Sequence, residues 1–459
     1  MNKLTSQQRK LAYLGGILIL LIPIIALGLP SDGTGGSGGT LAQLRTKYEL
    51  GEADLGDVDP SSATMNLVLL GMRGVAVNML YSDFEKQKDR KMWAEMEATT
   101  KSIVRLQPHF EKVWEMNGHN LAWNTSAEWE AVSDRYGWVK KGGKFLIQGV
   151  KQNRKSTHLQ YHVATVYQKK IGIADEAVYY RHYFLHDPDP KFKGGVDQDF
   201  NPEELDSYQV AKKEFRKACL IEDTEHRAQH ITDRSLFRSM PARCQFDYSA
   251  ALQKDGKFGD ETRLAWQESL SDWTTQYGQE VFSVPVGDLG SGVKFDIRME
   301  MTREEIKREV SNPDDVVLML DIVERYRKMV NYYYWRTRAN CEAEQSTSEA
   351  HRNFYAANQA YKNQEFEKAR GFAFAGMKSF DEILKKPEFS DLRNEESLVE
   401  ECLLAVVVWK SIYLLAEESP PADYPLKWLE IEYQGNDQLN RIVRRNFKRM
   451  YVENPAIGK

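Results

Sequence analysis

Three pairs of histidines with the same spacing are the residues of this chain best suited to chemistry. The two histidines of each pair are four residues apart: His158 with His162, His182 with His186, and His226 with His230. Residues four apart on a helix share one face, so each pair could offer two imidazoles to one metal ion. No pair contains the Glu of the H-E-x-x-H zinc motif, and no third ligand is obvious. Histidines on polar helix surfaces explain the same spacing, and we expect this use rather than metal binding.

The sequence lacks the motifs of the common catalytic classes. It has no P-loop, kinase motif set or paired-carboxylate motif, and no G-x-S-x-G nucleophile elbow outside the Gly-rich run at residues 33–39. Residues 33–39 (GTGGSGG) do contain the spacing G-x-G-x-x-G. That fingerprint binds a dinucleotide only between a strand and the following helix, and here an apolar run precedes it. We interpret the glycines as a flexible tether, and expect neither an enzyme nor a cofactor.

The four cysteines are widely separated in the sequence: Cys219, Cys244, Cys341 and Cys402. They form no C-x-x-C pair, so their spacing supports no zinc ribbon, iron–sulfur site or c-type haem attachment. In an oxidising compartment they could form up to two disulfides, with three possible connectivities.

Charge and aromatic patterning argue against a nucleic acid partner. The formal net charge is -5, which gives no general attraction for a polyanion. Residues 332–335 are four consecutive aromatics in a basic segment, but neighbouring helical side chains point to different faces, so we expect core packing rather than base stacking. The basic helix at residues 439–449 could bind anionic lipid or an acidic partner, or pack on the rest of the chain.

The segment Leu11–Leu29 is an apolar run without a charge. A membrane-spanning helix needs about 20 such residues, so we predict a single membrane anchor that contacts the lipid bilayer. Lys3, Arg9 and Lys10 precede the run, which places the N-terminus in the cytoplasm and the bulk of the chain outside it. The alternative is a signal peptide cleaved near residues 26–28, although such apolar regions usually span only about 7–15 residues.

Helical periodicity dominates the chain after residue 62, and we predict a mainly α fold. A long polar loop at His186–Glu204 interrupts it, and alternating residues after Val281 predict a small β-hairpin. The expected organisation is a cytoplasmic tip and transmembrane anchor at 1–30, a Gly-rich tether and acidic linker at 31–62, an N-terminal helical-repeat region at 63–280, the hairpin at 281–301 and a C-terminal helical-repeat region at 302–459.

Two segments, at residues 106–118 and 357–369, have the residue pattern of a tetratricopeptide repeat. Small residues let two helices approach closely, and aromatics beside the turn set the angle between them. Pro387 falls later than that repeat requires, so the second helix of its unit is overlong. The residues that we expect to pack the repeats are Pro108, Trp114, Gly118, Ala357, Tyr361, Phe366 and Ala369.

With the predicted anchor, the stretches Ile103–Asn124 and Trp138–Gly172 make this chain resemble the membrane-anchored, tetratricopeptide-like proteins common in planctomycetes. Most members of that group are uncharacterised, and some carry the label iron-responsive element. Such an element is an RNA hairpin, and the chain shows no RNA-binding pattern. The resemblance implies an anchored array of paired helices.

These observations lead us to expect a single-pass membrane protein whose helical-repeat array is an extracytoplasmic scaffold for an unknown protein partner. The alternative from a different class is a membrane-tethered metal-binding protein or metalloenzyme that uses the paired histidines. We expect no nucleic acid partner.

Overall fold

The computed structural model describes residues 73–225, 232–286, 294–310 and 312–449, together with single positions between residues 7 and 23. The predicted tether, and most of the predicted span Leu11–Leu29, lie outside the described residues. No helix of the described part has both the length and the apolar character needed to cross a bilayer. The chain divides into two units, with unit 1 comprising 1–166, 186–202 and 217–228, and unit 2 comprising 167–185, 203–216 and 229–459.

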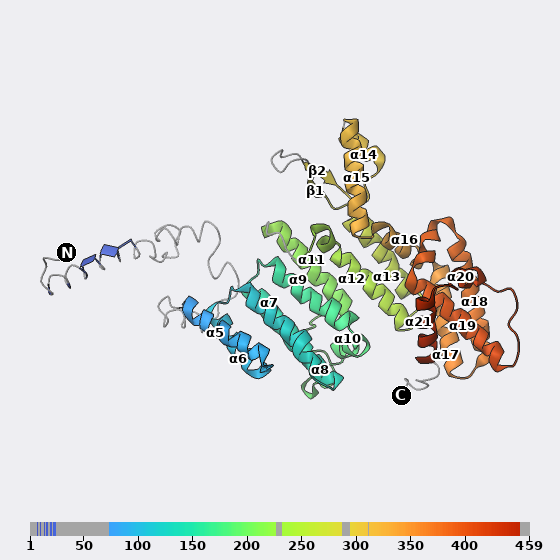
Figure 1. The fold of residues 1–459 in the computed structure, drawn as a ribbon, viewed down its shortest axis with the longest axis horizontal. Helices are drawn as coiled ribbons and strands as arrows, with labels where there is room; N and C mark the ends of the chain where they lie inside the picture. Colours follow the sequence, from blue (N-terminus) through green and yellow to red (C-terminus); the bar gives the residue numbers. More distant parts are fainter. Residues whose placement is uncertain are drawn as a thin grey trace. The chain divides into compact units, whose positions relative to one another are not determined.

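Unit 1 is a series of helices in which successive members pack against one another (Figure 1). Two of its α-helices lead into segments with π-helical hydrogen bonding, and a third segment is a short 3-10 helix. The elements are α5 (Arg73–Asp89), α6 (Trp93–Leu106), α7 (Glu111–His119), the π segment η1 (Asn120–Thr125), α8 (Val132–Gln152), α9 (Thr157–Thr165), the π segment η2 (Val166–Ile173), which continues into unit 2, and the 3-10 helix η3 (Pro190–Phe192).

Small residues let α7 and α8 pack closely. The indole Nε1 of Trp114 donates a hydrogen bond of 2.8 Å to the carbonyl of Pro108, which joins the turn before α7 to the helix itself. A Cβ added at Gly149 would lie 2.9 Å from the Cβ of Trp114, and one added at Gly118 would lie 2.4 Å from Leu146 Cγ. Pro108, Trp114 and Gly118 therefore all take part in packing these helices.

The polar loop predicted at His186–Glu204 is irregular apart from η3, and its part in unit 1 is tied to α8 by ion pairs. Lys140 Nζ lies 2.7 Å from Asp187 Oδ2 and 3.4 Å from Asp197 Oδ2, and all three side chains are buried. Lys144 Nζ lies 2.7 Å from the other oxygen of Asp197. A buried charge is tolerated only when it is paired, so these contacts fix the loop on α8.

Unit 2 is also built of helices, with one two-stranded sheet. Two of its helices lie in segments shared with unit 1: η2, and α11 (Ser207–Glu225), which begins in unit 2 and ends in unit 1. The others are α10 (Ala177–Leu185), α12 (Arg234–Lys254), α13 (Asp260–Ser271), the π segment η4 (Asp272–Tyr277), α14 (Arg303–Glu309), α15 (Pro313–Met329), α16 (Tyr332–Glu342), α17 (Gln345–Lys362), α18 (Phe366–Lys385), the 3-10 helix η5 (Pro387–Asn394), α19 (Glu396–Leu415), α20 (Lys427–Glu432) and α21 (Asp437–Phe447).

The predicted β-hairpin is confirmed. Strands β1 (Phe282–Pro285) and β2 (Lys294–Ile297) pair antiparallel, with Phe282 opposite Ile297. Together with α14 and α15, they form the part of unit 2 drawn at the top of Figure 1. The Thr302 side chain and Glu305 form a complete capping box at the start of α14, because each satisfies a free backbone N–H of the other.

From residue 312 the sequence pattern alone favours one helix that continues past Tyr334, but helix α15 is shorter than that. It ends at Met329, and Asn331 takes a left-handed conformation with φ 54° before α16 begins. Asparagine tolerates this conformation better than most residues do. Tyr332 then turns inward, where its ring stacks on Trp273 with centroids 5.3 Å apart, so this aromatic is a core residue as predicted.

Helices α17 and α18 form the hairpin of which Ala357–Ala369 is the turn region. Ala357 and Ala369 are buried, and the rings of Tyr361 and Phe366 meet edge to face at 5.5 Å. A Cβ added at Gly376 would lie 2.5 Å from the ring of Phe354, so the two helix backbones are in close contact here.

The apolar helix α19 packs as a core helix. Ten of its residues, including Cys402 and Trp409, are buried. Lys410 Nζ reaches Glu430 at 2.7 Å, which neutralises the charge without exposing the apolar face. The mainly helical fold with a small hairpin is therefore confirmed.

Candidate functional site

The strongest candidate site lies in unit 1, where Glu115 of α7 meets His158 and His162 of α9. The hydroxyl of Ser156 accepts a hydrogen bond of 3.2 Å from Leu159 N and so caps α9. This cap fixes the start of a helix on which the two histidines stand one turn apart. Glu115 lies at the middle of α7, which packs beside α9.

The three side chains converge on one point. His158 Nδ1 is 3.4 Å from Glu115 Oε2, and His162 Nε2 is 3.3 Å from Glu115 Oε1. The imidazole centroids are 5.4 Å apart, and one ligand atom from each of the three residues lies within 4.8 Å of the other two. The side chains of His158, His162 and Glu115 are 33%, 21% and 16% exposed, so solvent can reach the cluster.

Glu115 is held in its ionised form. Burial alone would raise its pKa, but the contacts with His158, His162 and Lys112 outweigh burial and hold the pKa far below the ordinary value. Lys112 Nζ donates to both carboxylate oxygens, at 2.8 and 2.9 Å. The cluster therefore presents a carboxylate and two imidazoles, the donor types that bind zinc in proteins.

The other two histidine pairs do not form such a cluster among the described residues. His182 lies on α10, but this helix ends at Leu185, so His186 does not continue it. His186 Nδ1 instead lies 3.3 Å from the carbonyl oxygen of Gly194. His226 and His230 lie outside the described residues.

The four cysteines are all described, and none of them forms a disulfide. Three of them are buried, and burial raises the pKa of the Cys341 thiol to about 12. A thiol with so high a pKa carries almost no thiolate at neutral pH, which makes it a poor nucleophile and a packing residue.

A buried charge network lies between α16, α17 and α19 in unit 2. His351 Nε2 is 3.0 Å from Glu342, and its Nδ1 is 2.9 Å from Glu401. Burial alone would lower the pKa of His351, but the two carboxylates raise it to about 10. Burial alone would raise the pKa of Glu342, but His351, Arg338 and Gln253 lower it to about 2. His351 is therefore an imidazolium with both N–H groups paired, and its role is structural.

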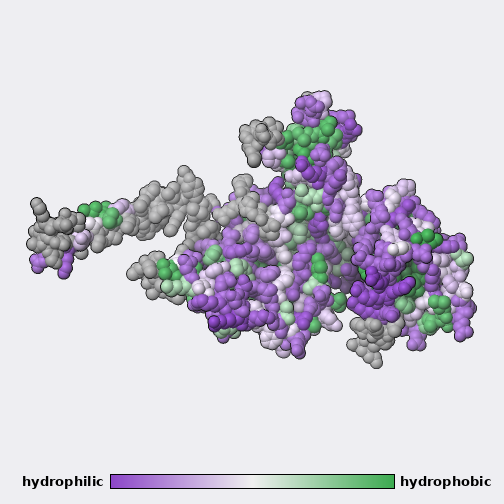
Figure 2. Space-filling model, in the orientation of Figure 1, coloured by the Kyte–Doolittle hydropathy of each residue, from purple (hydrophilic) through white to green (hydrophobic). Residues whose placement is uncertain are grey.

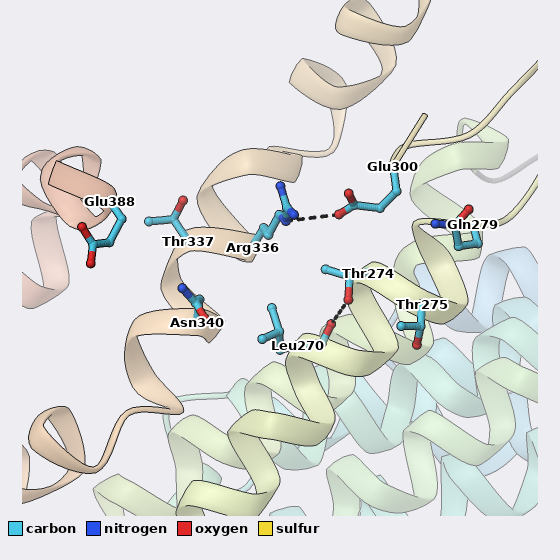
Figure 3. Close-up of a pocket in the computed structure, with 9 residues that line it drawn as sticks. All are labelled: Leu270, Thr274, Thr275, Gln279, Glu300, Arg336, Thr337, Asn340 and Glu388. Carbon is cyan, nitrogen blue, oxygen red and sulfur yellow. Dashed lines mark hydrogen bonds and ion pairs between the residues drawn. The ribbon is translucent and has the colours of Figure 1, made fainter. Parts of the chain in front are cut away.

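The polar groove drawn in Figure 3 has a volume of about 470 Å³ and lies within unit 2. Arg336 Nε is 3.2 Å from Glu300 Oε1, and the Thr274 hydroxyl donates to a backbone carbonyl at 2.7 Å. These groups are already satisfied by one another, so we assign no ligand to this groove. It is lined by Leu270, Thr274, Thr275, Gln279, Glu300, Arg336, Thr337, Asn340 and Glu388.

A second groove in unit 2, of about 510 Å³, has a different character. Its walls come from α18, from α20 and from the loop that leads into α20. Phe374 and Ile431 remain 42% and 58% exposed in it. We call this the α18–α20 groove, and it is lined by Phe374, Asp381, Lys385, Asp423, Tyr424, Pro425, Lys427, Trp428 and Ile431.

Apolar surface also lies over the hairpin and α15, where Figure 2 shows apolar residues at the top of the view. Val281, Val317 and Leu318 are exposed there. Scattered exposed apolar residues are ordinary, and this surface, unlike the α18–α20 groove, carries no further sign of a binding site.

The sequence alone did not reveal Glu115 as the partner of the histidines. It lies 43 residues before His158, in a segment that reads as a repeat helix, and no local motif links them. The α18–α20 groove was missed for the same reason, because its walls lie at residues 374–385 and 423–431, far apart in the sequence. No protein-family model matches the chain, and no curated protein matches it either.

Proposed function

We propose that this protein is a membrane-anchored helical-repeat scaffold, with its bulk outside the cytoplasm, that binds a partner protein in the α18–α20 groove. The uncharged run Leu11–Leu29 supports the anchor. The close α17–α18 hairpin, with buried Ala357 and Ala369, supports a repeat-like architecture. The observation that carries the proposal is the groove, which combines concave shape with exposed aromatic and aliphatic side chains.

The walls of the groove are joined by polar contacts between residues of α18 and the segment around α20. Asp381 accepts hydrogen bonds from Trp428 Nε1 at 2.7 Å, from Leu426 N at 3.2 Å and from Lys385 Nζ at 2.6 Å. Burial alone would raise the pKa of Asp381, but the bonds from Lys385 and Trp428 outweigh it and lower the pKa. A pre-organised surface loses little conformational entropy on binding.

The start of α20 is fixed in the same way. Leu426 is buried in a left-handed conformation with φ 64°, directly before the helix. This conformation is strained for a branched residue, and it persists only where the surroundings hold it. Lys410 Nζ lies 4.8 Å from the centroid of the Tyr424 ring, and the ring of Trp409 packs against it at a tilt, with centroids 5.3 Å apart. These two residues of α19 therefore hold the loop that carries Tyr424.

The chemistry of the groove favours an apolar side chain of a partner. The main polar groups of the walls already have partners, so the faces left for a ligand are the ring of Phe374 and the aliphatic chains of Pro425 and Ile431. Grooves of this kind bind the apolar residues of an amphipathic helix or extended peptide, and charged rims set the orientation. Lys427, whose ammonium group donates to the uncharged carbonyl of Ala422, supplies such a rim charge and favours an acidic residue beside the apolar anchor.

Site-specific photo-crosslinking in intact membranes tests this proposal. A photoreactive amino acid placed at Ile431 of the full-length chain should form one discrete adduct with a partner protein. The matched control is Leu264 on α13, which is 56% exposed against 58% for Ile431 but lies outside the groove. Adduct formation at residue 431 alone supports the proposal. Equal adducts at both positions, or none at residue 431, contradict it.

A substitution in the groove provides a second test of the proposal. Phe374→Glu places a charge on an exposed wall residue and should abolish the adduct at residue 431 while the helical circular dichroism stays unchanged. Release of the protein from vesicles by alkaline carbonate would contradict the membrane anchor without bearing on the groove, so the two parts of the proposal fail separately.

A further inference from the structure

We propose that Glu115, His158 and His162 form a binding site for a zinc ion, with a fourth position left for water. This inference is independent of the α18–α20 groove, since it concerns unit 1 alone. It rests on the separation of the ligand atoms, on a buried ring nitrogen without a hydrogen bond, and on the donor types.

The separations match the geometry of a zinc site. Zinc binds imidazole nitrogen and carboxylate oxygen at about 2.0–2.2 Å in a tetrahedron, which places neighbouring ligand atoms about 3.3 Å apart. The His158 Nδ1–Glu115 Oε2 and His162 Nε2–Glu115 Oε1 distances are 3.4 and 3.3 Å. Hydrogen bonds between these atom types are usually shorter, at about 2.7–3.2 Å. The two contacts use different carboxylate oxygens, so a small rotation of Glu115 or bidentate binding completes the set.

The unsatisfied nitrogen belongs to His162. Its Nε2 is buried and makes no hydrogen bond with any described residue, although it lies 3.3 Å from the carboxylate. A buried polar atom without a partner is costly, and most such atoms in proteins are satisfied by protein, water or an ion. A zinc ion between His162 and Glu115 would satisfy it directly.

The donor set also selects the metal. Two imidazoles and one carboxylate suit zinc and other late first-row divalent cations, whereas calcium and magnesium prefer oxygen ligands alone. Neutral imidazoles and one ionised carboxylate leave a net charge of +1 with Zn²⁺, which partial exposure to solvent can accommodate. The same exposure gives the ion a route into the site.

Lys112 is the one feature that opposes metal binding. Its ammonium group contacts both oxygens of Glu115, at 2.8 and 2.9 Å, and would repel a cation. The Lys112 side chain is 57% exposed, so it can swing into solvent when a metal enters. This competition predicts the direction of a mutational effect. Removal of the ammonium group should strengthen metal binding rather than weaken it.

The experiment is metal titration of the full-length, tag-free chain in detergent at pH 7.5. Isothermal titration with Zn²⁺ should give one site per chain, and Co²⁺ should give the intense visible absorption of a tetrahedral complex. Glu115→Gln and His162→Gln should each weaken zinc binding by about 100-fold or more, since even outer-shell changes cost about 10–100-fold. Lys112→Met should tighten it by about 3- to 10-fold.

The control is the double variant with His182→Gln and His186→Gln, which removes two exposed histidines outside the cluster. It should bind zinc as the unaltered chain does. The proposal is overturned if the unaltered chain binds no zinc, or if binding survives Glu115→Gln and His162→Gln. It is also overturned if the control variant loses the site, or if Lys112→Met weakens binding. Circular dichroism of each variant separates loss of the site from loss of the fold.

Discussion

The buried imidazolium of His351 predicts that unit 2 loses stability as the pH rises above about 6.5. An unfolded histidine titrates near 6.5, whereas the two carboxylates raise the pKa of folded His351 to about 10. Between these values the folded chain holds a proton that the unfolded chain has lost. Stability therefore falls with rising pH, by at most about 1.4 kcal/mol per pH unit. From pH 6.5 to 8.5, the expected loss is about 2.3 kcal/mol, because half of the unfolded histidine is still protonated at pH 6.5.

Glu342 sets the lower pH limit of this stabilisation. Its pKa falls to about 2 in the folded chain, so its contribution is complete above the unfolded value near 4.3 and disappears as the pH falls towards 2. The network formed by His351, Glu342 and Glu401 should therefore stabilise unit 2 most between about pH 4.5 and 6.5.

The perturbation that isolates this effect is the double variant His351→Gln and Glu342→Gln. It replaces the charged pair with two neutral side chains of similar size that can still hydrogen bond, for example with Gln253, whose Nε2 lies 2.9 Å from Glu342. The single change His351→Gln should cost more, about 3–5 kcal/mol, because it leaves the buried Glu342 carboxylate with only the distant Arg338, 3.9 Å away, as a charged partner.

The assay is urea unfolding of the full-length chain, followed by circular dichroism and tryptophan fluorescence at pH 5.5, 6.5, 7.5 and 8.5. The quantity of interest is the difference in stability between the unaltered chain and the double variant at each pH. This difference should shrink by about 2.3 kcal/mol from pH 6.5 to 8.5. His186→Gln, a change at an exposed histidine, serves as the control and should leave the pH dependence unchanged. A difference that stays constant from pH 6.5 to 8.5 would refute the assignment of a charged His351.

Substitutions at four further positions of unit 2 test its local packing and backbone conformation by the same urea unfolding. Thr302→Ala removes the capping box of α14 and should cost about 1 kcal/mol, with no loss expected if the box were incidental. Gly376→Ala places a Cβ 2.5 Å from the ring of Phe354 and should cost about 1–2 kcal/mol, whereas Gly371→Ala on the same helix meets no atom within 4 Å and should stabilise by about 0.5–1 kcal/mol. Equal effects of the two glycine changes would contradict the close packing of α17 on α18. Asn331→Ala should cost about 1 kcal/mol because its φ is 54°, and Asn331→Gly should cost nothing.

Local features of the fold could be predicted from the sequence because their causes are local. The capping box at Thr302, the proline-led start of α15 and the alternation of β2 all depend on neighbouring residues. The break at Asn331 was missed because a left-handed residue interrupts an otherwise continuous helical pattern, and asparagine also occurs within helices.

The candidate sites needed the tertiary structure. The pairing of His158 with His162 follows from their spacing, but Glu115 joins them only because α7 and α9 pack together. Likewise, His351 reads as an ordinary helical histidine, and its charge state depends on Glu342 and Glu401 on other helices. Long-range contacts of this kind leave no periodic signal in one sequence.

The π segments η1, η2 and η4 have a consequence for length variation along the chain. Each follows an α-helix without a break, and a π turn holds one residue more than an α turn. In η2, Val166 and Ile171 are both fully buried although they are five positions apart, a spacing that would place them about 140° apart on an α-helix. Single-residue deletions should therefore be tolerated better at these three places than within α8, and alignments of related chains should show their one-residue gaps there.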